Sequence, residues 1–249
     1  MSDKIYDLDA GFWNIRGSFR VGGILNIGAQ CSLIQLASGH FIFLDSYALT
    51  GDVRDEVMAL TDNGQKVEAV LNLHPFHTVH CAQMAKDFPQ AIFYGSSRHH
   101  TKVPEVQWAE DLVESEAVAQ RYPELEFSIV RGIDYISSNE MIHVGSLLAY
   151  HPASKSLHVD DTFISPPIKA LEAILPELML HPTTKQALKD KPNAGQQYCD
   201  WATNLAHEWQ DVRHFCAAHS HLVTFHKGEF KKALLKAINK ARPKLENTP

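Results

Sequence analysis

Apolar residues in the first part of the chain recur in short runs that are typical of β-strands. With glycines and polar turn residues between them, these runs occupy residues 12–17, 20–28, 32–36 and 40–45. Residues 52–61 instead place apolar side chains at helical spacing, and Asn63 and Gly64 follow as an end signal. The pattern predicts a strand meander followed by a helix.

Strand and helix patterns alternate further along the chain. A predicted strand over residues 67–73 leads into a helix that should begin near Pro75 and continue to Phe88, and residues 91–94 read as the next strand. This order is typical of sheets covered by helices. Residues 95–125 show no clear pattern, and we expect the adjacent His99 and His100 to be solvated loop residues.

The second half of the chain begins with β patterns and becomes helical later. The β patterns occupy residues 127–130, 135–138, 140–143, 146–150 and 156–159. Residues 166–213 then show helical patterns over 168–175 and 198–209, and residues 229–240 form a closing amphipathic helix. We interpret the whole as an α/β protein, with residues 1–249 as a single domain and residues 166–213 as a helical insertion.

Composition and charge exclude several classes of protein. The 249 residues carry a formal net charge of -6, which leaves no general basic field for nucleic acid. The four cysteines are scattered and form no CxxC pair, so reduced thiols are the simplest interpretation. No apolar stretch approaches the ~18 residues of a membrane span, and the N-terminus does not resemble a signal peptide. A cytoplasmic location is expected, with a small-molecule partner.

Three histidines directly follow the strand over residues 67–73. Pro75 favours an extended conformation for His74 and suits the first turn of a helix, on which His77 and His80 would share a face. Neutral imidazole is the commonest metal ligand, so the stretch predicts half of a metal site. The alternative is a set of surface histidines.

Further candidate ligands follow later β runs. Asp160 and Asp161 come at the end of the strand over residues 156–159, where they could bind a metal or cap a turn. A short apolar run near residue 215 ends in His219 and His221.

Taken in order, these motifs resemble the metallo-β-lactamase superfamily over roughly residues 20–225. The resemblance implies an αββα metallo-β-lactamase-like sandwich with a helical C-terminal elaboration and a metal site at one edge. In the signature H-x-H-x-D-H, His77 and His80 match the second and last histidines. The first histidine is displaced, with Pro75 in its place, and Val79 replaces the aspartate.

The resemblance also implies roles for single residues. His143 looks like the next ligand, Asp161 like the bridging carboxylate, and His219 like the last ligand, with His221 and His226 as competitors. Asp45 should cap a loop through backbone hydrogen bonds. The implied metal ligands are His74, His77, His80, His143, Asp161 and His219, of which Asp161 and His80 would also take part in catalysis.

The implied function is metal-dependent hydrolysis of an ester, thioester, lactone or phosphoester by a metal-bound water. Because Val79 offers no ligand, we expect one tightly bound zinc or iron ion per chain, and Val79→Asp should raise the occupancy toward two. The alternative is a superfamily member without hydrolase activity, either a binding or scaffold protein or a mononuclear iron redox protein. The oligomeric state is left open.

Overall fold

The structure is a computed structural model that describes residues 3–21, 25–166 and 174–246. The chain divides into two compact units, Met1–Glu126 (unit 1) and Phe127–Pro249 (unit 2). In the described part of the chain, none of the helices has the length and apolar character needed to cross a membrane. Most of the predicted helix over residues 168–175 lies outside the described residues.

Unit 1 is built on a six-stranded sheet. Its strands are β1 (Lys4–Asp7), β2 (Phe12–Gly17), β5 (Ala29–Gln35), β6 (Phe41–Leu44), β7 (Val67–Leu71) and β8 (Ile92–Tyr94), and they lie side by side in this order. The first four are antiparallel, as the predicted meander requires, whereas β6, β7 and β8 are parallel. A short pair, β3 (Arg20–Val21) and β4 (Leu25–Asn26), forms a separate ribbon.

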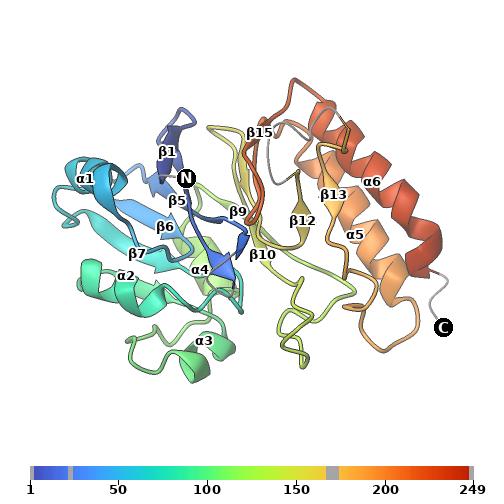
Figure 1. Ribbon diagram of the computed structural model, residues 1–249, viewed down its shortest axis with the longest axis horizontal. Helices are drawn as coiled ribbons and strands as arrows, with labels where there is room; N and C mark the ends of the chain where they lie inside the picture. Colours follow the sequence, from blue (N-terminus) through green and yellow to red (C-terminus); the bar gives the residue numbers. More distant parts are fainter. Residues whose placement is uncertain (1–2, 22–24, 167–173, 247–249) are drawn as a thin grey trace. The chain divides into compact units, whose positions relative to one another are not determined.

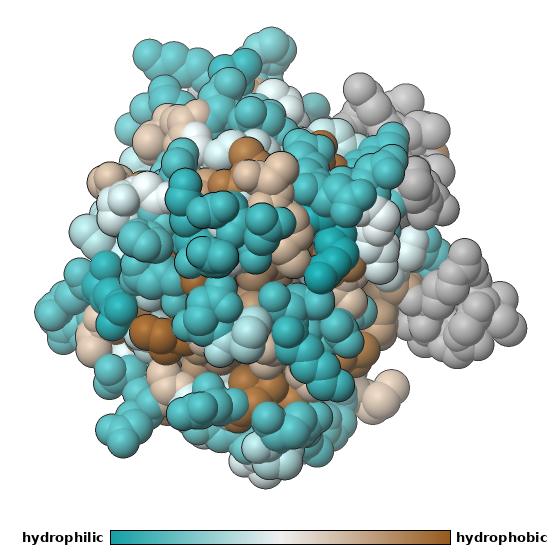
Figure 2. Space-filling model, turned by 90° about the vertical axis from the view of Figure 1, so that its left-hand side faces the viewer, coloured by the Kyte–Doolittle hydropathy of each residue, from teal (hydrophilic) through white to brown (hydrophobic). Residues whose placement is uncertain are grey.

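Helices cover one face of this sheet. Unit 1 contains α1 (Gly51–Leu60), α2 (Cys81–Asp87), α3 (Ser97–Lys102) and α4 (Glu116–Arg121). Val57 of α1 and Met84 of α2 are fully buried in one apolar cluster with Phe43 of the sheet. The outer side of these two helices carries mainly hydrophilic residues (Figure 2), which fits the one-sided apolar pattern of a surface helix.

Two predictions for unit 1 were wrong. The helix after the histidines begins at Cys81 and not near Pro75, so residues 72–80 form bends and turns. His99 and His100 belong to α3, and the side chain of His99 is fully buried. In both places turn and capping hydrogen bonds decide the local structure, and hydrophobic periodicity does not report them.

Unit 2 contains a five-stranded sheet. Its strands are β9 (Glu126–Ile129), which begins at the unit boundary, β10 (Leu147–His151), β11 (Ser156–His158), β14 (His214–Cys216) and β15 (Val223–Thr224). The spatial order is β15-β14-β11-β10-β9, and β11 and β14 are parallel. A small hairpin is formed by β12 (Phe163–Ile164) and β13 (Met179–Leu180). Residues 135–143, predicted to contain strands, lie outside any strand.

Two long helices complete unit 2. They are α5 (Ala194–Glu208), which confirms the helical pattern over residues 198–209, and α6 (Glu229–Glu246). Figure 1 shows them side by side next to the sheet and the hairpin. Tyr198 of α5 and Leu234 of α6 are fully buried in one apolar cluster with Leu157 and Phe215 of the sheet. A Cβ atom at Gly195 would lie 2.0 Å from the backbone oxygen of Leu245, so the close helix contact requires glycine.

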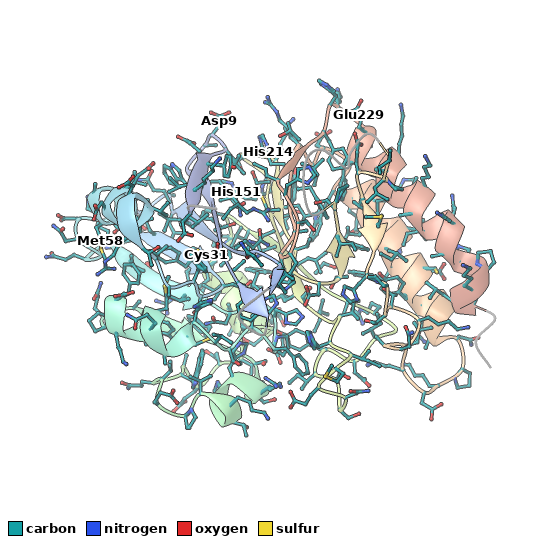
Figure 3. All side chains as sticks on the ribbon, in the orientation of Figure 1. Asp9, Cys31, Met58, His151, His214 and Glu229 are labelled. Atoms are coloured by element: carbon teal, nitrogen blue, oxygen red, sulfur yellow. The ribbon has the colours of Figure 1, made fainter. Side chains whose placement is uncertain are left out.

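One end of the unit 2 sheet is occupied by polar residues. His151, Ser156 and His214 are in register on β10, β11 and β14, so they lie in one row across the sheet; His151 and His214 are labelled in Figure 3. All three are buried. The opposite ends of β11 and β14 lead to Asp161 and His219.

Candidate metal centre

The parallel strands of unit 1 bring their carboxyl ends to one edge of the sheet. Asp45 follows β6 with a φ of 61°, a left-handed conformation that aspartate tolerates. Its Oδ1 atom accepts the N–H of Leu73 at 2.8 Å, which confirms the predicted capping role. Next to it, the Ser46 hydroxyl donates to Asn72 Oδ1 at 2.7 Å. These bonds fix the start of the histidine loop.

His74 and His77 lie together in that loop. Their rings stack with centroids 4.1 Å apart. The backbone N–H of Phe76 donates to His74 Nδ1 at 3.2 Å. Because an amide N–H can only donate, this nitrogen carries no proton, and the proton of neutral His74 is on Nε2. In this tautomer neither nitrogen of His74 has a lone pair left for a metal, so His77 is the better ligand candidate of the two.

The loop that carries these rings is held from outside by Arg98. Its guanidinium lies 4.0 Å from the centroid of the Phe76 ring and donates to the carbonyl oxygen of Pro75 at 3.1 Å. The cation–π contact and the hydrogen bond act on neighbouring residues, so α3 fixes the conformation of the turn. The positions of His74 and His77 therefore depend on a residue outside the histidine motif.

His80 and Val79 are neighbours that differ in their exposure to solvent. The Tyr47 ring lies edge-on to the His80 ring with centroids 5.1 Å apart. Burial lowers the pKa of His80, and the neighbouring His77 lowers it further. The buried Nε2 atom of His80 has no hydrogen-bond partner among the described residues, which suits a metal ligand. In contrast, Val79 is 67% exposed, so an aspartate at this position would meet solvent first.

His99 is a buried histidine that the sequence did not indicate. Its Nδ1 atom accepts the N–H of Ser96 at 3.0 Å, and its ring packs on Trp108. Burial lowers its pKa to about 3, with smaller contributions from His74 and His77. His99 is thus a neutral group near the histidine loop. A signal was available, since Ser96 precedes His99 at the spacing of a capping box, with histidine in place of glutamate.

In unit 2, strand register brings Asp161 and His219 together. His158 of β11 pairs with Cys216 of the parallel strand β14. Asp161 and His219 each lie three residues further along, so the two side chains emerge at the same level. His219 Nε2 lies 3.7 Å from Asp161 Oδ1, and His143 Nδ1 lies 3.5 Å from Asp161 Oδ2.

The loop that carries His143 is fixed by a threonine next to Asp161. Thr162 Oγ1 donates to the carbonyl oxygen of Val144 at 2.7 Å and lies 2.7 Å from Ser146 Oγ. The Asp161 carboxylate is almost fully buried, whereas the two histidines beside it remain partly exposed. The three donors are thus held by different segments and converge within unit 2.

The distances between Asp161 and each of its two histidines suit pairs of metal ligands. Two ligand atoms at about 2.1 Å from a tetrahedral metal are roughly 3.4 Å apart, longer than a hydrogen bond. The observed separations of 3.5 and 3.7 Å lie close to this value. One carboxylate oxygen faces each imidazole, so Asp161 could serve as a ligand together with either histidine. The donor set therefore fits a divalent cation such as zinc or iron.

The remaining candidate ligands have other neighbours or are exposed to solvent. The Nδ1 atom of His221 lies within hydrogen-bond distance of the Pro166 carbonyl oxygen, and His226 is exposed. Asp160 faces His158, with Oδ1 and Nε2 3.7 Å apart, and both side chains are buried. For His219, in contrast, the structure gives a contact with Asp161.

Sequence reasoning also missed His181, which directly follows β13. Phe163 pairs with Leu180 in the β12–β13 hairpin, so the next position on each strand places His181 opposite Thr162 and beside Asp161. Burial lowers the pKa of His181, the Asp161 carboxylate raises it, and His143 and His219 lower it. Strand β13 lies within residues 166–213, for which the sequence pattern predicts a helical insertion and therefore no strand end.

Comparisons with solved structures support the predicted fold. No family model and no curated protein matches the chain. A metallo-β-lactamase from Erythrobacter litoralis matches with a TM-score of 0.63 and 13% identity, over 96% of this chain and 97% of that one. FIM-1 from Pseudomonas aeruginosa, in its mono-zinc form, matches with a TM-score of 0.62 and 10% identity, over 97% of each chain.

A third solved structure, the metallo-β-lactamase from Hirschia baltica, matches with a TM-score of 0.59 and 13% identity, over 96% of this chain and 98% of that one. At such low sequence identity, the similarity is evidence for the fold alone. The sheet orders and helices of both units agree with the predicted α/β class. The chain therefore has the metallo-β-lactamase fold, as the order of its motifs indicated.

Proposed function

We propose that this protein is a metal-dependent hydrolase of a small ester, thioester, lactone or phosphoester. The observation that carries the proposal is the arrangement of His143 and His219 on opposite oxygens of the buried Asp161, each at a separation that two ligands of one metal show. Imidazole nitrogens and carboxylate oxygens are the usual protein ligands of zinc and iron.

The proposed ligands are taken unit by unit. In unit 2 they are His143, Asp161 and His219, and in unit 1 they are His77 and His80. A bound zinc or iron ion would supply a Lewis acid that polarises the scissile carbonyl or phosphoryl group and activates water. Asp161 would orient the attacking water by accepting one of its protons in a hydrogen bond.

We further propose one tightly bound ion per chain. A second ion would need a further anionic ligand, and Val79 supplies none. The exposure of Val79 changes the expectation for Val79→Asp: with a side chain that is 67% exposed, the new carboxylate should leave the stoichiometry at one. This replaces the gain in occupancy that the sequence pattern suggested.

The test is elemental analysis of the purified protein combined with hydrolysis of 4-nitrophenyl acetate and a lactone. We expect about one zinc or iron per chain. His143→Ala and Asp161→Asn should lose the metal and the activity, whereas His226→Ala, which changes an exposed histidine of unit 2, should lose neither. Iron with no hydrolysis would favour the redox alternative, and full hydrolysis by metal-free protein would exclude the proposal.

A further inference from the structure

His181 lies opposite Thr162 and so next to the Asp161 cluster, and hydrogen bonds of its own turn hold its ring. The backbone N–H of Thr183 donates to His181 Nδ1 at 3.3 Å, and Thr183 Oγ1 lies 2.8 Å from the same nitrogen. The Thr184 hydroxyl donates to the carbonyl oxygen of His181 at 2.7 Å, which closes the turn. The ring is therefore fixed by its own loop.

These bonds determine which ring nitrogen carries the proton. Because Nδ1 accepts an amide N–H, its lone pair is used, and the proton of the neutral ring is on Nε2. Binding a metal through Nε2 would require removal of that proton, and binding through Nδ1 would require loss of the Thr183 bond. Protonation of Nδ1 would break the same bond. His181 is thus held as a neutral N–H donor.

The donor is available to a bound molecule. His181 is half-buried, and no hydrogen bond joins its Nε2 atom to the described residues. Its place opposite Thr162 puts the ring beside Asp161, His143 and His219. A donor beside these groups is suited to an oxygen on which the proposed reaction develops negative charge.

We propose that His181 binds an anionic oxygen of the ligand through Nε2–H and is not a metal ligand. The proposal rests on the proposed function for its catalytic part. When water adds to an ester carbonyl, the electron pair of the C=O bond moves to oxygen, and the N–H of His181 donates a hydrogen bond to that oxyanion. The electron pair then re-forms the C=O bond as the bond to the alcohol oxygen breaks, and the alcohol leaves with the proton that the attacking water gives up. His181 neither gains nor loses a proton in these steps.

The first test does not depend on turnover. Long-range 15N–1H spectra of the protein should show the proton of His181 on Nε2 at pH 7.5, and titration with inorganic phosphate should shift this N–H signal. His151 is the control, because its Nδ1 atom also accepts a backbone N–H, from Ser154 at 3.3 Å, while it lies at the opposite end of the sheet. Its signal should stay constant. A proton on Nδ1 of His181, or no response to phosphate, would overturn the proposal.

Two matched variants test the donor itself. Glutamine can place an amide N–H near the position of Nε2, whereas phenylalanine fills the space without a donor. We expect His181→Phe to weaken phosphate binding about tenfold and to lower kcat about 100-fold, as is typical of a lost oxyanion donor. His181→Gln should retain most of both. Equal losses in the two variants would contradict the proposal.

Metal content separates this proposal from the proposed function. Both variants should hold as much metal as the unmodified protein, and loss of metal in His181→Phe would show that His181 is a ligand. If the unmodified protein neither binds metal nor hydrolyses esters, the proposed function fails, while the phosphate titration still decides whether His181 binds anions.

Discussion

Hydrogen bonds from backbone amides determine which ring nitrogen carries the proton in several histidines of this protein. The spacing of the histidines in the sequence does not reveal these bonds. His74, His99 and His181 each accept an amide N–H at Nδ1 and therefore carry the proton on Nε2. In His80 the buried Nε2 atom has no such partner among the described residues. Neighbouring histidines of one motif can thus be donors or ligands, depending on a single peptide group.

At the residue scale, His99 should make stability depend on pH. Its folded-state pKa of about 3 is far below the unfolded value of about 6.5, so the unfolded chain binds more protons between these values. The stabilisation is complete above pH 6.5 and is lost as the pH falls. At pH 5 the loss from this residue should be about 2 kcal/mol.

Urea unfolding of chelator-treated protein at pH 7 and pH 5 measures this effect. His99→Asn is the matched variant, because its Oδ1 atom can accept the Ser96 N–H but does not titrate. The variant should lose about 2 kcal/mol less than the unmodified protein between the two pH values. The same loss in both proteins would show that His99 is not kept neutral by burial.

At the scale of elements, glycine determines how closely α5 and α6 approach. Alanine usually stabilises a helix by roughly 0.5–1 kcal/mol relative to glycine. A Cβ atom at Gly195 would, however, lie 2.0 Å from the Leu245 backbone oxygen, which cannot move without α6. Gly195→Ala should therefore lower the free energy of unfolding by about 1–3 kcal/mol.

Chemical denaturation followed by circular dichroism tests this prediction. Asn204→Ala, on the exposed side of the same helix, is the control and should leave the midpoint unchanged or raise it slightly. A Gly195→Ala variant as stable as the control would mean that the two helices can separate without cost.

The sequence predicted the elements better than the connections between them. Most strands and the helices α1, α2, α5 and α6 were expected from periodicity, because each buries one apolar face. Register was not predictable, and register is what places His219 and His181 beside Asp161. The sequence pattern predicts a helix where the histidine loop lies, because the turn bonds of His74 and the Arg98 contact leave no periodic signal.

For the whole molecule, metal binding should raise stability where the ligands lie. A ligand present at 100 times its Kd adds about 2.7 kcal/mol to the stability of the state that binds it. Hydrogen exchange with and without zinc should therefore show slower exchange in β11 and β14, which lead to Asp161 and His219. His219→Ala should abolish the effect, whereas His226→Ala should leave it unchanged. Equal exchange with and without zinc would show that unit 2 does not hold the metal.

The parallel pairing of β11 with β14 also affects when the strands of unit 2 can pair during synthesis of the chain. Unit 1 starts from hairpin neighbours that can pair as soon as they are synthesised, whereas β11 must wait until β12, β13 and α5 have followed it before its partner exists. During that interval the edge of β11 is open to strands of other molecules. Ribosome-bound chains that end before His214 should therefore be the species most dependent on chaperones, and slow translation through α5 should increase aggregation.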